Sequence, residues 1–119
     1  MTPQEFVIRL RGAVVEENTA IYRDLFSSTS IEKASDPYWR RALGLFGALS
    51  PEQREVFLEV VRQVAVDTTS NVLGVIDGVN ALGGGEEFEL DLDGKKLSGD
   101  LQSLFLAEEE RCLVRLSGE

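Results

Sequence analysis

Apolar residues recur at the spacing of an α-helix between Ser50 and Leu82. At about 100° per residue they fall on one stripe. The members of the stripe are Phe57, Val60, Val61, Val64, Val72, Val75, Ile76 and Val79. The run Ser50-Pro51-Glu52-Gln53 is typical of a helix start, because the Ser50 and Gln53 side chains can each bond the other's backbone N–H and Pro tolerates the first position. We therefore expect a helix to about Asp77, stabilised by packing, since Val and Thr are mediocre helix formers.

Two more helices are predicted before this central one. Thr2-Pro3-Gln4-Glu5 repeats the start signal, and the helix should run from Pro3 to about Phe26. Its apolar face is Phe6, Val7, Leu10, Val14, Ile21 and Leu25. After a connector over residues 27–36, Asp36 can cap a helix over 37–49. The apolar face of this second helix is Tyr38, Trp39, Ala42, Leu43, Phe46 and Leu49.

A β-hairpin is predicted after the Gly83-Gly84-Gly85 run, where the apolar period changes from 3.6 to 2. In residues 86–93 acidic and apolar side chains alternate strictly from Glu87 on, and Asp93-Gly94 is a strong turn signal. A two-residue turn over residues 87–98 places Leu90 opposite Leu97 and Asp91 opposite Lys96. We expect Phe88, Leu90 and Leu92 to pack on the helices, because an isolated hairpin is marginal in water.

The last segment allows two interpretations. In the favoured one, Asp100 caps a helix whose apolar face carries Leu101, Leu104, Phe105, Cys112 and Leu116. In the other, the helix ends near Glu110 and residues 111–116 form a third strand beside the hairpin.

Together these elements predict a predominantly helical α+β fold, with about four helices around a long central helix and one β-hairpin in the C-terminal half. A chain of 119 residues is expected to form one domain, residues 1–119. The apolar runs are too short to span a membrane, and the N-terminus does not resemble a signal peptide. The single cysteine, Cys112, suits a reducing compartment, so we expect a cytoplasmic protein in which Cys112 is a small core residue.

Composition narrows the chemistry. The chain has no histidine, which excludes Ser-His-Asp catalysis and histidine-based zinc sites. The net charge is −9, and residues 86–119 hold 10 acidic against 4 basic side chains. That balance disfavours direct nucleic-acid binding, which needs clustered Lys and Arg. We expect no enzyme activity, no cofactor, no bound metal and no membrane partner.

Two sets of residues are candidates for a binding site. The first set is Tyr38, Trp39, Glu89 and Asp91. The two aromatic residues either anchor a partner or close the core, and the two acidic strand residues either dock a basic protein or are solvated. The second set consists of the polar residues that interrupt or flank the helical stripes: Glu17, Asp67, Thr68 and Asn71. These four form either an inter-helix pocket or a buried network that fixes helix register.

The leading functional hypothesis is a non-catalytic protein that binds another protein, with a basic protein as one candidate partner. An inhibitor, an immunity-type antidote and an accessory subunit all fit, and a homodimer through the long helix is compatible. The alternative is a small-molecule-binding or metal-dependent enzyme domain that uses the inter-helix polar pocket. A purely structural subunit is a third possibility that sequence does not separate from the first.

Overall fold

The computed structural model describes residues 1–116 and is predominantly helical, with one short hairpin. The helical elements are α1 (Pro3–Arg11), the π-helical segment η1 (Gly12–Glu17), α2 (Asn18–Ser28), the 3₁₀ turn η2 (Ile31–Lys33), α3 (Pro37–Ala48), α4 (Pro51–Ile76) and α5 (Leu101–Leu116). The strands are β1 (Asp91–Leu92) and β2 (Lys95–Lys96). The α+β class and the hairpin in the C-terminal half are confirmed.

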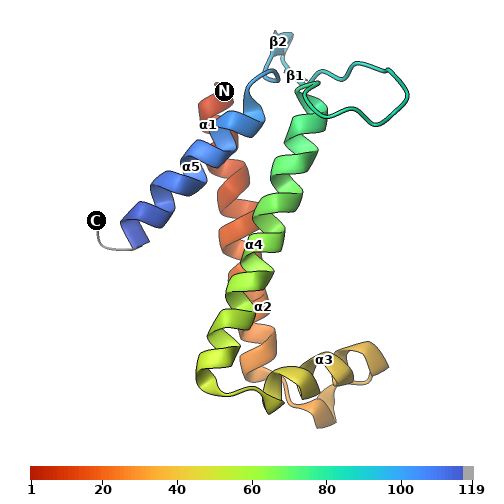
Figure 1. The fold of residues 1–119 in the computed structure, drawn as a ribbon, viewed down its shortest axis with the longest axis vertical. Helices are drawn as coiled ribbons and strands as arrows, with labels where there is room; N and C mark the ends of the chain where they lie inside the picture. Colours follow the sequence, from red (N-terminus) through yellow and green to blue (C-terminus); the bar gives the residue numbers. More distant parts are fainter. Residues whose placement is uncertain (117–119) are drawn as a thin grey trace.

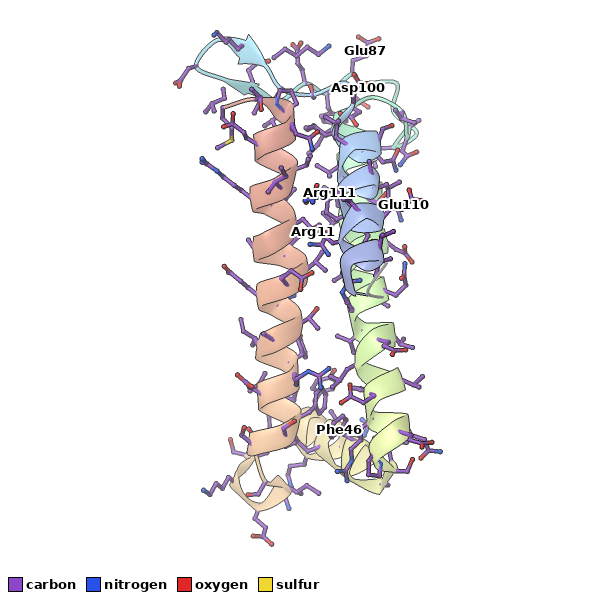
Figure 2. All side chains as sticks on the ribbon, turned by 90° about the vertical axis from the view of Figure 1, so that its left-hand side faces the viewer. Arg11, Phe46, Glu87, Asp100, Glu110 and Arg111 are labelled. Carbon is purple, nitrogen blue, oxygen red and sulfur yellow. The ribbon has the colours of Figure 1, made fainter. Side chains whose placement is uncertain are left out.

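The frame of the molecule is an antiparallel pair of long helices. One is the continuous run of α1, η1 and α2, and the other is α4 (Figures 1 and 2). α5 packs along the upper half of this pair on one side, whereas α3 and the loop over residues 77–90 project on the other side (Figure 1). No helix within residues 1–116 is long and apolar enough to cross a membrane.

Local capping explains where the predicted helices begin. The Ser50 hydroxyl accepts from the Gln53 N–H at 3.2 Å and the Gln53 side chain accepts from the Ser50 N–H at 2.9 Å, which completes a capping box. Asp36 accepts from the Tyr38 N–H at 2.8 Å and Thr2 from the Glu5 N–H at 3.1 Å. These three starts are confirmed.

The start of α5 is capped by a residue that we did not predict. Asp77, just past α4, accepts from the backbone N–H groups of Gly99 at 2.7 Å, Leu101 at 3.1 Å and Gln102 at 2.8 Å. Asp100 precedes the helix, but the side-chain capping bonds come from Asp77. One carboxylate thereby satisfies orphan N–H groups of α5 and ties its N-terminus to the end of α4. The helix continues to Leu116, so the alternative of a third strand at residues 111–116 is wrong.

The hairpin has the predicted register but little of the predicted packing. Asp91 pairs with Lys96, and the positive φ angles of Asp93 (51°) and Gly94 (79°) fit a two-residue turn. Of the strand's apolar side chains, Leu90 and Leu97 turn inward, with the Leu97 N–H donating to the Leu90 carbonyl at 2.8 Å. Phe88 and Leu92 are exposed, which corrects the prediction that they pack on the helices. Each strand is only two residues long, too short for alternation to carry a whole face into the core.

Two separate apolar clusters hold the helices together. The upper cluster joins α1, α4 and α5 through Val7, Val15, Val66, Leu73, Leu101 and Phe105. The lower cluster joins α2, α3 and α4 through Phe26, Leu43, Phe46 and Leu58. Cys112 is only half-buried and belongs to neither cluster, so the prediction that it is a core residue is wrong. Its position one turn beyond Glu108 places it beside that carboxylate rather than in the apolar interior.

Candidate functional site

One broad side of the helix pair is left uncovered, and we call it the open face. It lies opposite α5, on the side from which α3 and the 77–90 loop project (Figure 1). The side chains that line its grooves come from both long helices: Phe6, Leu10, Val14, Tyr22, Phe57, Val61, Val64, Val72 and Ile76.

The open face exists because α4 is apolar on two sides. Its buried apolar side chains are Leu58, Val66 and Leu73, which face the core. The periodic valines of the predicted stripe lie elsewhere on the helix. The exposed members include Val60, Val64 and Val72. The predicted stripe therefore packs only in part: Phe57 and Ile76 lie against the lower and upper clusters, whereas the exposed valines stay in contact with water within the single chain.

Two adjoining grooves run along the middle of the open face. Their volumes are about 320 and 280 Å³, and they share Val14, Thr68 and Thr69. Polar groups lie at the centre, where Asn18 is exposed and Thr19 is half-buried. The Thr19 Oγ1 atom is buried and has no hydrogen-bond partner within residues 1–116. A buried hydroxyl normally has a partner, so this atom marks a place where one is missing.

The lower end of the open face is formed by the aromatic residues around α3. Trp39 is half-buried, and the centroid of its ring lies 6.0 Å from the Phe26 ring centroid and 6.3 Å from the Tyr22 ring centroid. Tyr38 leans edge-on against Trp39 at 5.5 Å but is 64% exposed. Of the two aromatic candidates, Trp39 thus helps close the lower cluster and Tyr38 is available to a partner.

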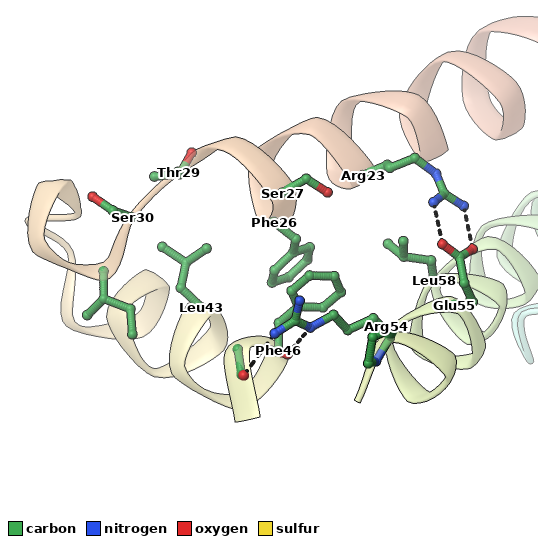
Figure 3. A pocket seen from close by; sticks show the side chains of 13 residues that line it. Arg23, Phe26, Ser27, Thr29, Ser30, Leu43, Phe46, Arg54, Glu55 and Leu58 are labelled. Atoms are coloured by element: carbon green, nitrogen blue, oxygen red, sulfur yellow. Dashed lines mark hydrogen bonds and ion pairs between the residues drawn. The ribbon is translucent and has the colours of Figure 1, made fainter. Parts of the chain in front are cut away.

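Another cleft lies between α2, α3 and α4, and its charged groups are already paired (Figure 3). It measures about 420 Å³. Arg23 forms a two-bond ion pair with Glu55 at 2.9 and 3.0 Å. Arg54 stacks over the Phe46 ring at 5.3 Å and donates to the carbonyls of Phe46 and Gly47. These bonds leave no charged side chain of the cleft aimed at a ligand.

The acidic candidates lie far from the aromatic ones. Glu89 and Asp91 are exposed at the hairpin, at the end of the molecule opposite α3 (Figure 1). Lys96 lies across the strand from Asp91 and forms an ion pair with Glu89 at 3.6 Å. The structure therefore does not bring the four first-choice candidates, Tyr38, Trp39, Glu89 and Asp91, into one site.

The alternative pocket is not assembled either. Glu17, Asp67 and Asn71 are exposed and line none of the cavities described here, and Thr68 alone borders the grooves. Asp67 accepts from the Gln63 side chain at 2.9 Å on its own helix. Within residues 1–116 no hydrogen bond joins any two of the four side chains, and no group of three or more Cys, Asp or Glu residues is placed to hold a metal ion.

Sequence reasoning missed a charged cluster between α1, η1, α4 and α5. The Glu109 carboxylate lies between two guanidinium groups: Arg11 donates to it at 3.0 and 2.8 Å, and Arg62 donates at 2.6 and 2.7 Å. Glu16 also bonds Arg11, at 2.7 Å. Arg11 and Glu109 are each only 5% exposed, and Arg11 projects from α1 toward α5 (Figure 2).

A signal for this cluster was present in the sequence. The run Glu108-Glu109-Glu110 reads as a solvated acidic patch, yet Glu108 and Glu109 lie on the same helical face as Leu101 and Phe105. Burial alone would raise the pKa of Glu109, but hydrogen bonds from Arg62 and Arg11 outweigh it and hold that pKa below its ordinary value. The bonds to Glu109 likewise raise the pKa of Arg62. The cluster is thus a fully paired clamp between helices.

Comparison of the chain with protein-family models, curated proteins and solved structures finds no match. The features of the molecule that point to a function are therefore the open face, the aromatic residues at its lower end and the charges that are already paired.

Proposed function

We propose that this protein acts without catalysis, by binding another protein through the open face. The observation that carries the proposal is the uncovered apolar surface of α4, where Val64 and Val72 are exposed and line the two grooves of the open face. Contiguous apolar surface of this kind on a folded chain is typical of interaction sites. The roles that fit are those of an inhibitor, an immunity-type antidote or an accessory subunit.

The extent of the surface supports the proposal. The chain exposes 8174 Å², whereas a compact protein of 13.1 kDa exposes about 6400 Å². Its radius of gyration is 17.7 Å, against about 13.5 Å for a compact chain of this length. The elongated shape leaves both long helices with a side that no other element of residues 1–116 covers. The excess, about 1800 Å², is more than the roughly 800 Å² that each partner contributes to a standard stable interface.

Charge placement also favours a protein partner. The buried carboxylate Glu109 and the cleft carboxylate Glu55 are both held by arginines. Five exposed acidic side chains gather in and just before the hairpin: Glu86, Glu87, Glu89, Asp91 and Asp93. The acidic hairpin end is a surface separate from the open face, and it suits a partner with basic residues because opposite charges steer the encounter.

The test compares two lysine substitutions on α4. Val64 and Val56 are the same residue type with nearly equal exposure, 58% and 56%, but only Val64 lines a groove of the open face. Tagged wild type, Val64→Lys and Val56→Lys are used to capture proteins from the native cell, and the recovered proteins are identified by mass spectrometry. The proposal expects a stoichiometric protein that Val64→Lys loses and Val56→Lys retains. Recovery of the tagged chain by itself in every case would overturn it.

A further inference from the structure

We propose that the occupant of the open face is a second copy of this chain, related by a two-fold axis that sets the two α4 helices antiparallel. The inference rests on the proposed function, because it keeps the open face as the binding surface and names what covers it. In such a dimer the two helix pairs stack face to face as a four-helix bundle, with α5 on the outside of each copy.

The area of the open face matches what a stable dimer needs. α4 has 26 residues and is therefore about 39 Å long, and two helices side by side are about 20 Å wide. Their product is about 800 Å², which is the area that each partner contributes to a standard stable interface. The surface in excess of a compact chain, about 1800 Å², leaves room for further contacts at the two ends.

The chemistry of the open face makes it complementary to itself. A two-fold interface brings each patch against the same patch, so a strongly charged patch would meet its own sign. This chain has a net charge of −9, yet the grooves along the middle of the open face are lined by apolar, Thr and Asn side chains. Self-association through this face therefore avoids the repulsion that acidic surfaces elsewhere would impose.

The two ends of the open face fit one another in the antiparallel arrangement. α3 projects from the lower end and carries the exposed apolar side chains Tyr38 and Leu45. The upper end carries exposed Val72, Val79 and Leu82. An antiparallel two-fold places α3 of each copy at the upper end of the other, so both sets become buried. A parallel two-fold would instead bring the two α3 helices together at one end.

The polar centre supplies the register. One groove of the open face is lined by Val64, Asn18 and Thr19, and Val64 lies close to the midpoint of α4. Because the axis that relates two antiparallel α4 helices passes near their midpoints, it passes near this groove. There the exposed Asn18 amides of the two copies come near one another across the axis. A single polar pair inside an apolar helix interface is a known means of fixing register and oligomeric state.

Sedimentation equilibrium of purified wild type, Val64→Lys and Val56→Lys tests the inference. We expect a wild-type mass of 2 × 13.1 = 26.2 kDa at micromolar concentration. Val64→Lys places two like charges at the axis and should weaken dimerisation at least about 100-fold. Val56→Lys should leave it unchanged. Because Val64 is exposed in the single chain, the variant should keep its helical circular dichroism. A monomeric wild type, or a dimer that Val64→Lys does not dissociate, would overturn the inference.

Co-expression of tagged and untagged copies separates this inference from the proposed function. Recovery of the untagged chain, lost in Val64→Lys, supports the dimer. Recovery of a different protein with the same dependence on Val64 leaves the proposed function standing and overturns the dimer. Recovery of neither overturns both. For the direction of the axis, Val64→Cys in a Cys112→Ser background should form a disulfide between copies, because an antiparallel axis places the two residues 64 side by side. A dimer without that disulfide would contradict the antiparallel arrangement.

Discussion

Substitution of Glu109 by Gln should destabilise the fold more than any other single change among the charged residues described here. The carboxylate accepts four hydrogen bonds from Arg11 and Arg62, and the Glu109 side chain is 7% exposed. Gln keeps an acceptor but removes the charge, which leaves two guanidinium groups with one partner, Glu16. Breaking a buried ion pair costs about 3–5 kcal/mol, and the remaining Glu16 bond places this case near the lower limit, about 3 kcal/mol.

Glu108→Gln is the matched control for this prediction. Glu108 is the adjacent residue and equally buried, but its guanidinium partner Arg111 is half-exposed and can return to water. Urea unfolding followed by circular dichroism should show the large loss for Glu109→Gln, equivalent to roughly 10 °C in Tm, and a clearly smaller one for Glu108→Gln. Equal losses, or a Glu109→Gln variant as stable as wild type, would refute the view that the paired clamp holds α1, α4 and α5 together.

Three further predictions concern pH, the core and a cap. The pKa of Glu109 is lowered in the folded chain, so its stabilising contribution is complete above its unfolded pKa of about 4.3 and is lost as pH falls through the lowered folded value. The difference in unfolding free energy between wild type and Glu109→Gln, measured by urea unfolding, should therefore narrow below about pH 4. Phe105→Ala should cost about 3–5 kcal/mol because the ring is fully buried, while Leu106→Ala on the exposed side of α5 should cost under about 1 kcal/mol in the same assay. Asp77→Ala should cost about 1–2 kcal/mol and speed amide exchange at the first turn of α5, and unchanged exchange at Gln102 would count against its capping role.

The elements of this fold could be predicted from sequence wherever the decisive interactions are local. Side-chain caps and Pro positions set the starts of α1, α3 and α4, and the Asp93-Gly94 turn set the pairing of Asp91 with Lys96. Each of these depends on residues within a few positions of one another. The helical period likewise extended α5 to Leu116.

The parts that could not be predicted depend on contacts between distant residues. Periodicity shows that α4 has an apolar stripe, but not that a second apolar side, with Val66 and Leu73, is the one buried in the single chain. Asp77 caps a helix that starts 24 residues later, and Glu109 meets Arg11 across 98 residues. The π-helical segment η1 also lies within a run whose sequence reads as ordinary α-helix. Such pairings follow only once the helices are placed.

The candidate site shows the same division. The way α3 meets the long helices decides that Tyr38 is exposed and Trp39 half-buried. The way the long helices pack leaves Glu17, Asp67 and Asn71 exposed and outside the grooves. Four of the valines that formed the clearest pattern in the sequence are left exposed: Val60, Val64, Val72 and Val79. Their regular spacing is understandable if the stripe packs, but against another chain.

The most direct measurement is the rate at which a cysteine on the open face reacts with a soluble thiol reagent. In a Cys112→Ser background, Val64→Cys and Val56→Cys replace valines with nearly equal exposure, 58% and 56%. If protein covers the open face, the cysteine at position 64 should react much more slowly than the one at 56, and the difference should shrink as the protein is diluted. Equal rates at every concentration, with or without native lysate, would contradict the claim that the open face is a protein interface.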